Sequence, residues 1–279
     1  MVHIITDSTC DIMKEEQDRM GITVLPLVVN FGEEMYKDGV ELSRKEFYDK
    51  LEKAQSLPTT SQVNPAEFEE VFEKIISNGD EVVCILLASE LSGTYQSAVI
   101  AADGIDSDNI YLVDSCTTTI GLSILLNEAI KLRDKGYSGK DIASNIQTLA
   151  GRVRLYAVID TLKFLKMGGR LSATSAMIGS ILGIHPIVEL KDAKVNVIGK
   201  SRSLKSGLTK LQEYLENDPA DFSYGFAYGH SNSEERLLKC MDHLKPLVKT
   251  NDIIIRNIGS VVGTHAGPGV VGIAYIAKE

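Results

Sequence analysis

The chain has 279 residues, of which 44% are hydrophobic and 24% charged, the composition of an ordinary soluble globular protein. This length exceeds what one hydrophobic core usually serves, so two domains are expected. A net charge of −9 argues against general nucleic-acid binding, which needs a basic face to displace counterions from phosphates.

Cysteine usage and the absence of long apolar runs indicate a cytoplasmic protein. The four cysteines are scattered without a CxxC pair, which favours free thiols over disulfides or zinc ligands. The first residues, MVHIITDST, lack the charged lead and apolar run of a signal peptide. No apolar stretch approaches the roughly 20 residues that span a bilayer. We therefore expect a soluble, cytoplasmic protein, with transient membrane contact left open.

Apolar runs and amphipathic segments alternate up to Gly151. Strands are expected at 2–6, 22–30, 82–88 and 110–113, and a hairpin-like excursion at 31–40. Helices are expected from near Ile12 and at 44–54, 66–76, 95–102, 120–135 and 140–151. Pro26 indicates an edge position or a bulge in the second strand. This alternation predicts a parallel sheet with helices on both faces.

The pattern changes after Gly151. Strands are expected at 153–159, 186–190, 195–198, 224–230, 253–259 and 270–276. Helical segments are expected at 162–167, from Ser172 onward, and at 203–215 and 234–247. Hairpins and helical crossovers are mixed here, which is typical of an α+β domain. The expected fold is therefore α/β with two closely packed domains: an α/β/α parallel-sheet domain at 1–151, with a small excursion near 31–60, and an α+β mixed-sheet domain at 152–279.

Hydroxylated residues follow the buried strand at 82–88. The segment LSGT at 91–94 leads directly into the expected helix at 95–102. The first N–H groups of a helix have no partner within it, and its dipole favours negative charge, so this corner suits a carboxylate or phosphate. The simpler interpretation is that Ser92 or Thr94 only caps the helix. Asp7 poses the same alternative after the first strand, as a ligand-facing residue or as a helix cap.

Two further stretches carry similar groups. PTTSQVNP at 58–65 is a polar loop bounded by prolines, and GTHAGPG at 263–269 is a glycine-rich turn with one histidine, His265. A histidine in such a turn is often structural, although loop residues frequently carry function. The other histidines are interpreted as structural or exposed: His3, His185, His230 and His243.

Five segments in this order resemble the DegV family. They are TDST at 6–9, TTSQ at 59–62, LSGTYQSA at 91–98, LKFLKMGGRLS at 162–172 and GTHAGPG at 263–269. The resemblance covers essentially the whole chain. It implies a bacterial fatty-acid-binding protein, similar to the acyl-carrying subunit of a fatty acid kinase. One departure is Val63, which replaces the proline common after the family's TSQ and puts the stiffness of that loop in doubt.

The resemblance also implies where the ligand lies. A long-chain fatty acid such as palmitate, stearate or oleate would lie between the two domains, its carboxylate held by Ser92 and by Thr60 or Ser61. His265 would be close to it, and no cofactor or metal is expected. Further residues in or near the motifs are expected close to the ligand: Gly93, Thr94, Gly169, Arg170 and Ile181. Ile181 belongs to an apolar helical stripe, a pattern that is more often ordinary core than a lipid tunnel.

Arg170 and Arg202 raise the question of a partner. Arg202 lies in a locally basic stretch of an acidic protein, and such charges are commonly only a solvated face. If the ATP-binding subunit of a fatty acid kinase phosphorylates the bound carboxylate, arginines near the tunnel mouth would suit phosphate or an acidic partner surface. The resulting acyl phosphate would feed phospholipid synthesis.

Two enzymatic alternatives are weaker. Ser92 and His265 could act as nucleophile and base of a hydrolase on an acyl substrate. However, the chain has no GxSxG elbow and no obvious carboxylate to orient His265. The family's fold also resembles part of dihydroxyacetone kinases, but the chain lacks GxxxxGK[ST] and GxGxxG after a strand. We therefore expect a non-catalytic carrier.

Overall fold

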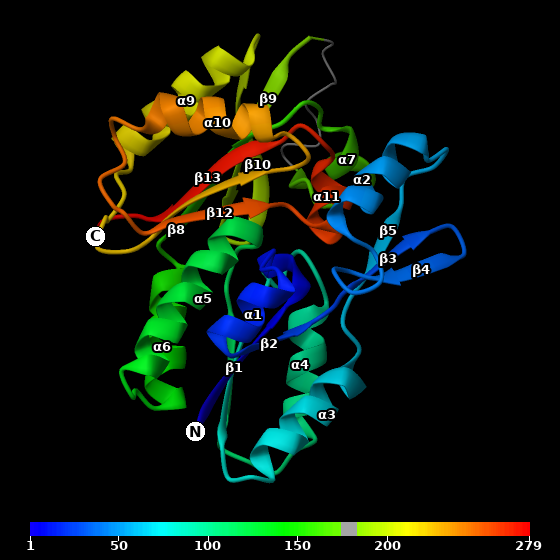
Figure 1. Ribbon diagram of the computed structural model, residues 1–279, viewed down its shortest axis with the longest axis vertical. Helices are drawn as coiled ribbons and strands as arrows, with labels where there is room; N and C mark the ends of the chain where they lie inside the picture. Colours follow the sequence, from blue (N-terminus) through cyan, green and yellow to red (C-terminus); the bar gives the residue numbers. More distant parts are fainter. Residues whose placement is uncertain (174–182) are drawn as a thin grey trace.

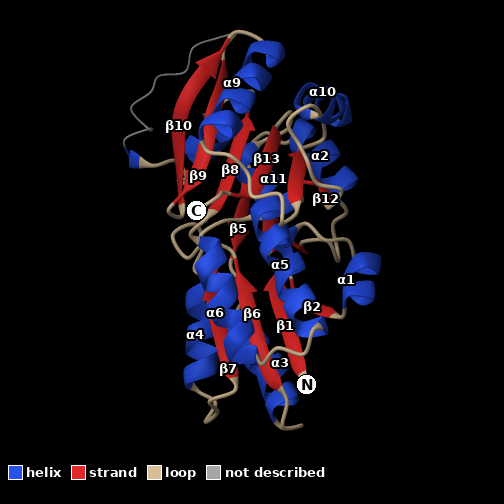
Figure 2. Ribbon diagram, turned by 90° about the vertical axis from the view of Figure 1, so that its left-hand side faces the viewer, coloured by secondary structure: helices blue, strands red, loops and turns tan. Residues whose placement is uncertain are grey.

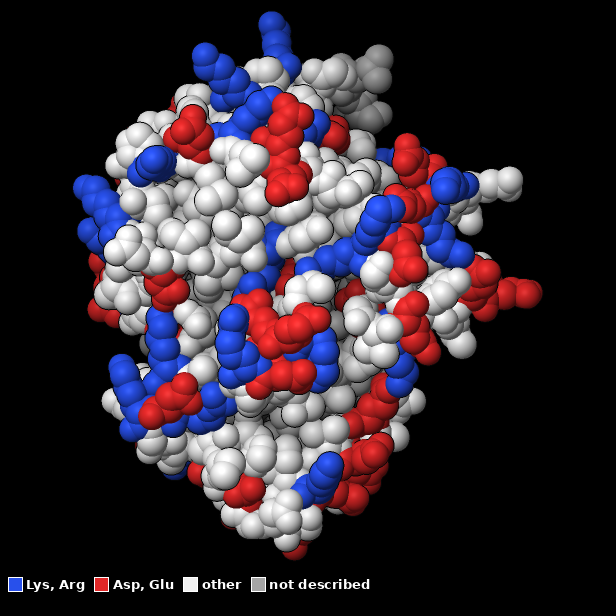
Figure 3. Space-filling model, in the orientation of Figure 1, with Lys and Arg blue, Asp and Glu red and all other residues white. Residues whose placement is uncertain are grey.

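A computed structural model describes residues 1–173 and 183–279, which form three β-sheets with flanking helices. The two larger sheets follow one another along the long axis of the molecule (Figures 1 and 2). The earlier half of the chain builds one end and the later half builds the other. Acidic and basic side chains are interspersed over the face seen in Figure 3. In the described part of the chain, no helix combines the length and apolarity needed to cross a bilayer.

The first half forms a four-stranded parallel sheet in the order β2-β1-β6-β7. Neighbouring residues of a strand point to opposite faces, so Ile4 packs with α5 and α6 whereas Ile5 packs with α3 and α4. The predicted α/β/α layering is therefore confirmed. The strands are β1 (Val2–Asp7), β2 (Ile22–Leu25), β6 (Glu81–Leu86) and β7 (Ile110–Asp114). The helices are α1 (Lys14–Met20), α3 (Pro65–Ile76), α4 (Thr94–Asp103), α5 (Thr119–Asp134) and α6 (Gly139–Ala150), with a 3₁₀ turn η1 (Ser8–Cys10) before α1.

The excursion after β2 is a small antiparallel sheet in the order β4-β3-β5. Helix α2 lies between β4 and β5 in the chain. Its strands are β3 (Val28–Phe31), β4 (Glu34–Lys37) and β5 (Thr59–Ser61), and α2 is Arg44–Lys53. The expected single strand at 22–30 is wrong, because β2 and β3 belong to different sheets on either side of Pro26, which has no N–H to donate. The expected polar loop at 58–65 is also wrong in part, since it contains β5.

The second half forms a six-stranded mixed sheet in the order β10-β9-β8-β13-β11-β12. Neighbouring strands are antiparallel except β11 and β12, which confirms the mixed sheet. The strands are β8 (Val153–Val158), β9 (His185–Lys191), β10 (Lys194–Ser201), β11 (Phe226–His230), β12 (Ile253–Asn257) and β13 (Val271–Ile276). Helices α9 (Leu204–Asn217) and α10 (Glu234–Leu244) cover one face of this sheet.

Helix α5 joins the two large sheets. Its apolar residues share one core with Ile4 of the parallel sheet and with Leu155 and Ala274 of the mixed sheet. A helix that is apolar on most of its circumference is expected to be buried on several sides. Figure 1 shows α5 reaching from the flank of the parallel sheet to the mixed sheet. The two halves of the chain therefore pack against each other through a continuous apolar core.

Two short helices of the second half, α7 (Lys163–Met167) and α11 (Ser260–Ala266), lie beside the excursion (Figure 1). The prediction of a glycine-rich turn at 263–269 is wrong in its first part, because Gly263 to Ala266 end α11. Gly263 lets this helix approach α2, since a Cβ there would lie 2.7 Å from the Phe47 ring. Gly267 then ends the helix with φ +77°, a left-handed conformation that favours glycine.

Candidate functional site

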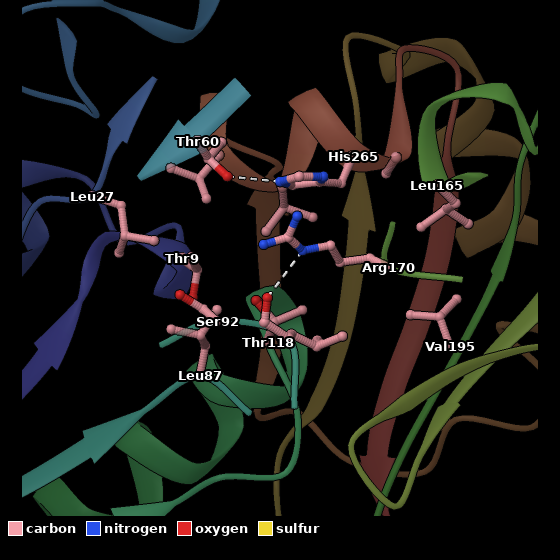
Figure 4. Close-up of a pocket in the computed structure, with 14 residues that line it drawn as sticks. Thr9, Leu27, Thr60, Leu87, Ser92, Thr118, Leu165, Arg170, Val195 and His265 are labelled. Carbon is pink, nitrogen blue, oxygen red and sulfur yellow. Dashed lines mark hydrogen bonds between the residues drawn. The ribbon is translucent and has the colours of Figure 1, made fainter. Parts of the chain in front are cut away.

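A cavity lies where the excursion, the parallel sheet and the two short helices meet. Figure 4 shows that the labelled side chains around it come from segments far apart in the sequence. Its polar lining includes Thr9, Thr60, Ser92, Arg170 and His265. The remaining lining residues are Leu27, Leu87, Leu91, Thr118, Leu165, Val195, Val261, Val262 and Ala266. We call this the head cavity.

A second cavity adjoins the head cavity and runs over the mixed sheet. Its walls are almost entirely aliphatic, with Leu155, Val188 and Leu190 among them. We call this the tail cavity. The two cavities share a set of lining residues, here called the waist: Thr118, Leu165, Val195, Val262 and Ala266. Together they form one elongated site, polar at one end and apolar at the other, which is the usual composition of a site for an amphipathic ligand.

His265 lies on α11 at the polar end, with its ring towards β5. Its Nε2 is 2.8 Å from the Thr60 Oγ1, a hydrogen bond between residues of the two halves (Figure 4). Its Nδ1 has no hydrogen-bond partner within the described residues, and a Cβ on Gly168 would lie only 2.2 Å from it. Burial, together with the nearby Arg170 charge, lowers the pKa of His265 to about 4. The imidazole is therefore neutral at physiological pH.

The hydroxyl of Ser92 lines the same end of the site. Ser92 Oγ is 3.0 Å from the Thr94 Oγ1 and accepts a weaker bond from the Thr94 N–H at 3.3 Å. The interpretation of Ser92 or Thr94 as the helix cap is wrong in position, because Gly93 is the N-cap residue of α4, but the Ser92 hydroxyl does accept from the first N–H of that helix. Thr94 is fully buried, and its hydroxyl hydrogen-bonds with that of Ser92.

Arg170 extends from the segment after α7 into the head cavity, beneath His265 in Figure 4. Its Nε donates to the Leu91 carbonyl at 3.1 Å and its Nη1 to the Gly168 carbonyl at 2.6 Å. These bonds tie the second half of the chain to the LSGT segment and place a fixed positive charge beside two hydroxyls. Such an arrangement attracts a carboxylate or a phosphate.

The structure separates Thr60 from Ser61. Alternate residues of β5 point to opposite sides, so Thr60 faces the cavity while the Ser61 Oγ accepts a 3.1 Å bond from Asn30 Nδ2. Two expected neighbours of the ligand, Gly93 and Gly169, do not line either cavity. Gly169 is exposed and adopts a left-handed conformation with φ +70°.

The remaining two expected residues are Ile181 and Arg202. Ile181 and the helical stripe around it lie outside the described residues. Arg202 is exposed just beyond β10 and lines neither cavity. At about 3.3 Å per residue, the strand places it on the order of 20 Å from Val195 at the waist.

Asp7 holds the strand ends around the head cavity instead of lining it. Its carboxylate accepts bonds from the N–H and Oγ1 of Thr9 and from the N–H of Leu87, at 2.6–2.9 Å. It thereby caps the 3₁₀ turn η1, so the expectation that it caps the helix near Ile12 is wrong in detail. Burial is the main reason that its pKa is raised to about 6.

Sequence reasoning did not single out Thr9, Leu87 or Thr118 as lining residues. Each follows or ends a strand of the parallel sheet, as Ser92 does. Because parallel strands end at the same edge of a sheet, this shared position is the signal that could have identified them.

The geometry does not form a hydrolytic triad. Ser92 bonds to Thr94, and His265 bonds to Thr60, so the two have no direct bond to each other. No carboxylate contacts the Nδ1 of His265 in the described part of the chain. Within residues 1–173 and 183–279 there is also no group of three or more His, Cys, Asp and Glu side chains that could hold a metal ion.

The fold and the site define an α/β protein with an elongated internal site for an amphipathic ligand. Residues 1–278 match the family model described as an uncharacterised protein of the DegV family, and the chain belongs to that family. A DegV domain-containing protein of Caldanaerobacter subterraneus is 37% identical over 278 residues, covering 99% of both chains. The predicted family is thus confirmed over its whole length.

Solved structures share the fold over nearly the whole chain. DegV of Bacillus subtilis, described as a fatty acid binding protein, is 32% identical with a TM-score of 0.85, and 99% of each chain is covered. A DegV family protein of Thermus thermophilus, described by its fatty acid binding, is 26% identical with a TM-score of 0.90 over 99% of each chain. A stearic acid-binding protein of Eubacterium ventriosum is 28% identical with a TM-score of 0.85, over 100% of this chain and 99% of that one.

Proposed function

We propose that this protein binds one long-chain fatty acid, with the carboxylate in the head cavity and the alkyl chain in the tail cavity. The observation that carries this proposal is the waist, because residues shared by both linings join a polar chamber to an aliphatic one. The fatty acids bound by structurally similar family members support the same ligand class.

The head cavity offers what a carboxylate requires. Thr60 and Ser92 present hydroxyls, and Arg170 supplies the positive charge that offsets the ligand's negative charge. Neutral His265 holds Thr60 in place across the two halves. Most of the affinity comes from the tail, since each methylene buried in an apolar site contributes about 0.8 kcal/mol.

The protein carries this ligand without a cofactor and presents its carboxylate to the ATP-binding subunit of a fatty acid kinase. Arg170 beside the carboxylate would also stabilise the phosphate of the resulting acyl phosphate. The finer assignment of a kinase partner rests on the resemblance to acyl-carrying subunits. Hydroxylamine trapping of acyl phosphate, formed only when this protein, kinase subunit and ATP are combined, tests it.

Mass spectrometry of the protein purified from cells tests fatty acid binding directly. We expect one equivalent of long-chain fatty acid in the native spectrum, released as the free acid by solvent extraction. Protein that is empty, and that takes up no added palmitate or oleate after delipidation, would contradict the proposal. Esterase activity that requires Ser92 would favour the hydrolase alternative instead.

Matched variants test the head group assignment. Thr60→Val and Ser92→Ala each remove one hydrogen bond to a charged group, which should weaken palmitate binding about tenfold. Ser61→Ala is the control, because the Ser61 hydroxyl faces Asn30 on the other side of β5. Equal weakening by Ser61→Ala and Thr60→Val would show that the carboxylate is not where we place it.

A further inference from the structure

The two segments that carry Thr60 and Ser92 touch outside the cavity, through the side chain of Gln62. Gln62 follows β5 and lies at the surface, and it lines neither cavity. Its Nε2 donates a 2.8 Å hydrogen bond to the Oγ of Ser97, a fully buried residue of α4. The side chain therefore connects the strand that presents Thr60 to the helix that follows Ser92.

Gly93 shows how closely this contact is built. A Cβ on Gly93 would lie 2.1 Å from the Oε1 of Gln62 and 2.8 Å from its Cδ. The backbone at Gly93 has φ −70° and ψ 2°, which other residues adopt without strain, so conformation alone does not require glycine here. The absence of a side chain at position 93 instead leaves room for the Gln62 amide.

The contact fixes both ends of a short span. Thr60 lies two residues before Gln62, and Ser92 directly precedes Gly93. After Gln62 the chain is held by Val63, which is fully buried, and by Asn64, which caps α3. Gln62 is thus a direct link between the segments that carry the two cavity hydroxyls.

We propose that Gln62, seated on Gly93, is a positioning residue that holds Thr60 and Ser92 at the separation needed to bind a carboxylate. The inference rests on the proposed function, and it concerns selectivity for the head group. A fatty alcohol uses the same tail cavity but carries no charged group for the two hydroxyls to share. Loss of the link should therefore weaken binding of the acid more than binding of the alcohol.

The test compares laurate with dodecanol on the delipidated full-length protein, by displacement of a fluorescent fatty acid. In Gln62→Ala, the preference for laurate should fall about tenfold, the typical effect of one charge-assisted hydrogen bond. Gln96→Ala is the matched control, because Gln96 is a glutamine exposed on α4. Unchanged preference in a folded Gln62→Ala would overturn the proposal.

A double-mutant cycle adds a prediction that a merely structural role would not make. Gly93→Ala should reproduce the defect of Gln62→Ala, because its Cβ displaces only the flexible end of the glutamine side chain. The double variant Gln62→Ala with Gly93→Ala should be no worse than either single variant, since both remove the same contact. Additive losses, or equal losses for acid and alcohol, would overturn the positioning role. Wild-type protein that binds neither ligand would instead refute the proposed function on which the inference rests.

Discussion

Ala266 provides the most direct test of the elongated site, because it lies at the waist between the two cavities. It is the last residue of α11, and its side chain lines both the head cavity and the tail cavity. Ala266→Leu adds three carbons at the point that an alkyl chain must pass. We predict that this variant still binds short fatty acids but no longer gains affinity from methylenes beyond the waist.

The magnitude follows from burial of the tail. Each methylene contributes about 0.8 kcal/mol, which is roughly a fourfold change in Kd. In the wild type, affinity should therefore rise about fourfold per added methylene until the tail cavity is full. In Ala266→Leu this slope should end at the chain length that reaches the waist, so the deficit grows with every further carbon.

Competition binding with saturated fatty acids from octanoate to stearate measures the slope on delipidated protein. Ala66→Leu is the control, because it makes the same change at an exposed position of α3. A folded Ala266→Leu protein with the wild-type slope through stearate would refute the reasoning. The alkyl chain of the ligand would then lie elsewhere in the protein.

Three further predictions concern titration. The pKa of His265 is lowered to about 4. Its contribution to the free energy of unfolding is therefore present above pH 6.5 and is lost as the pH falls through 4. Urea unfolding of His265→Gln, measured over the same pH range, should not show this loss. Removing the charge in Arg170→Gln should raise the pKa of His265. If the imidazole titration followed by NMR is unchanged in this variant, the Arg170 charge does not lower that pKa. Burial chiefly raises the pKa of Asp11 from 3.8 to about 7, so its contribution is full below pH 3.8 and is lost as the pH rises through 7. The difference in unfolding free energy between wild type and Asp11→Asn should therefore change by about 1.4 kcal/mol per pH unit between these values and stay flat above them, whereas a constant difference would count against that pKa.

Much of the fold could be predicted because its signals are local. Buried parallel strands such as β6 appear as short apolar runs. The helices expected at 44–54 and 140–151 follow serines in the sequence, and in the structure the side chains of Ser43 and Ser138 cap them. The division at Pro26 was harder, because each of the two strands is apolar and only their pairing assigns them to different sheets.

The site could be predicted in kind but not in detail. Motifs indicated Thr60, Ser61, Ser92 and His265, yet the choice between Thr60 and Ser61 depends on the pairing of β5 with β3, a contact between residues distant in sequence. Helix α11 was missed because GTHAGPG is rich in glycine, which disfavours helix when judged locally. Its close packing on Phe47 is what the glycine serves, and sequence alone does not display that contact.

The placement of α11 explains why the polar end of the site requires both halves of the chain. This helix belongs to the second half, but the first half holds its N-terminus: Asp11 Oδ1 accepts from the Gly259 N–H at 2.8 Å, and Asp38 Oδ1 accepts from the Ser260 N–H at 3.2 Å. These oxygens satisfy N–H groups that have no partner within the helix. Tyr48 adds a 3.0 Å bond from its hydroxyl to the Ile258 carbonyl. Because these contacts set the helix that carries His265, the hydrogen bond to Thr60 forms only when the two halves are packed together.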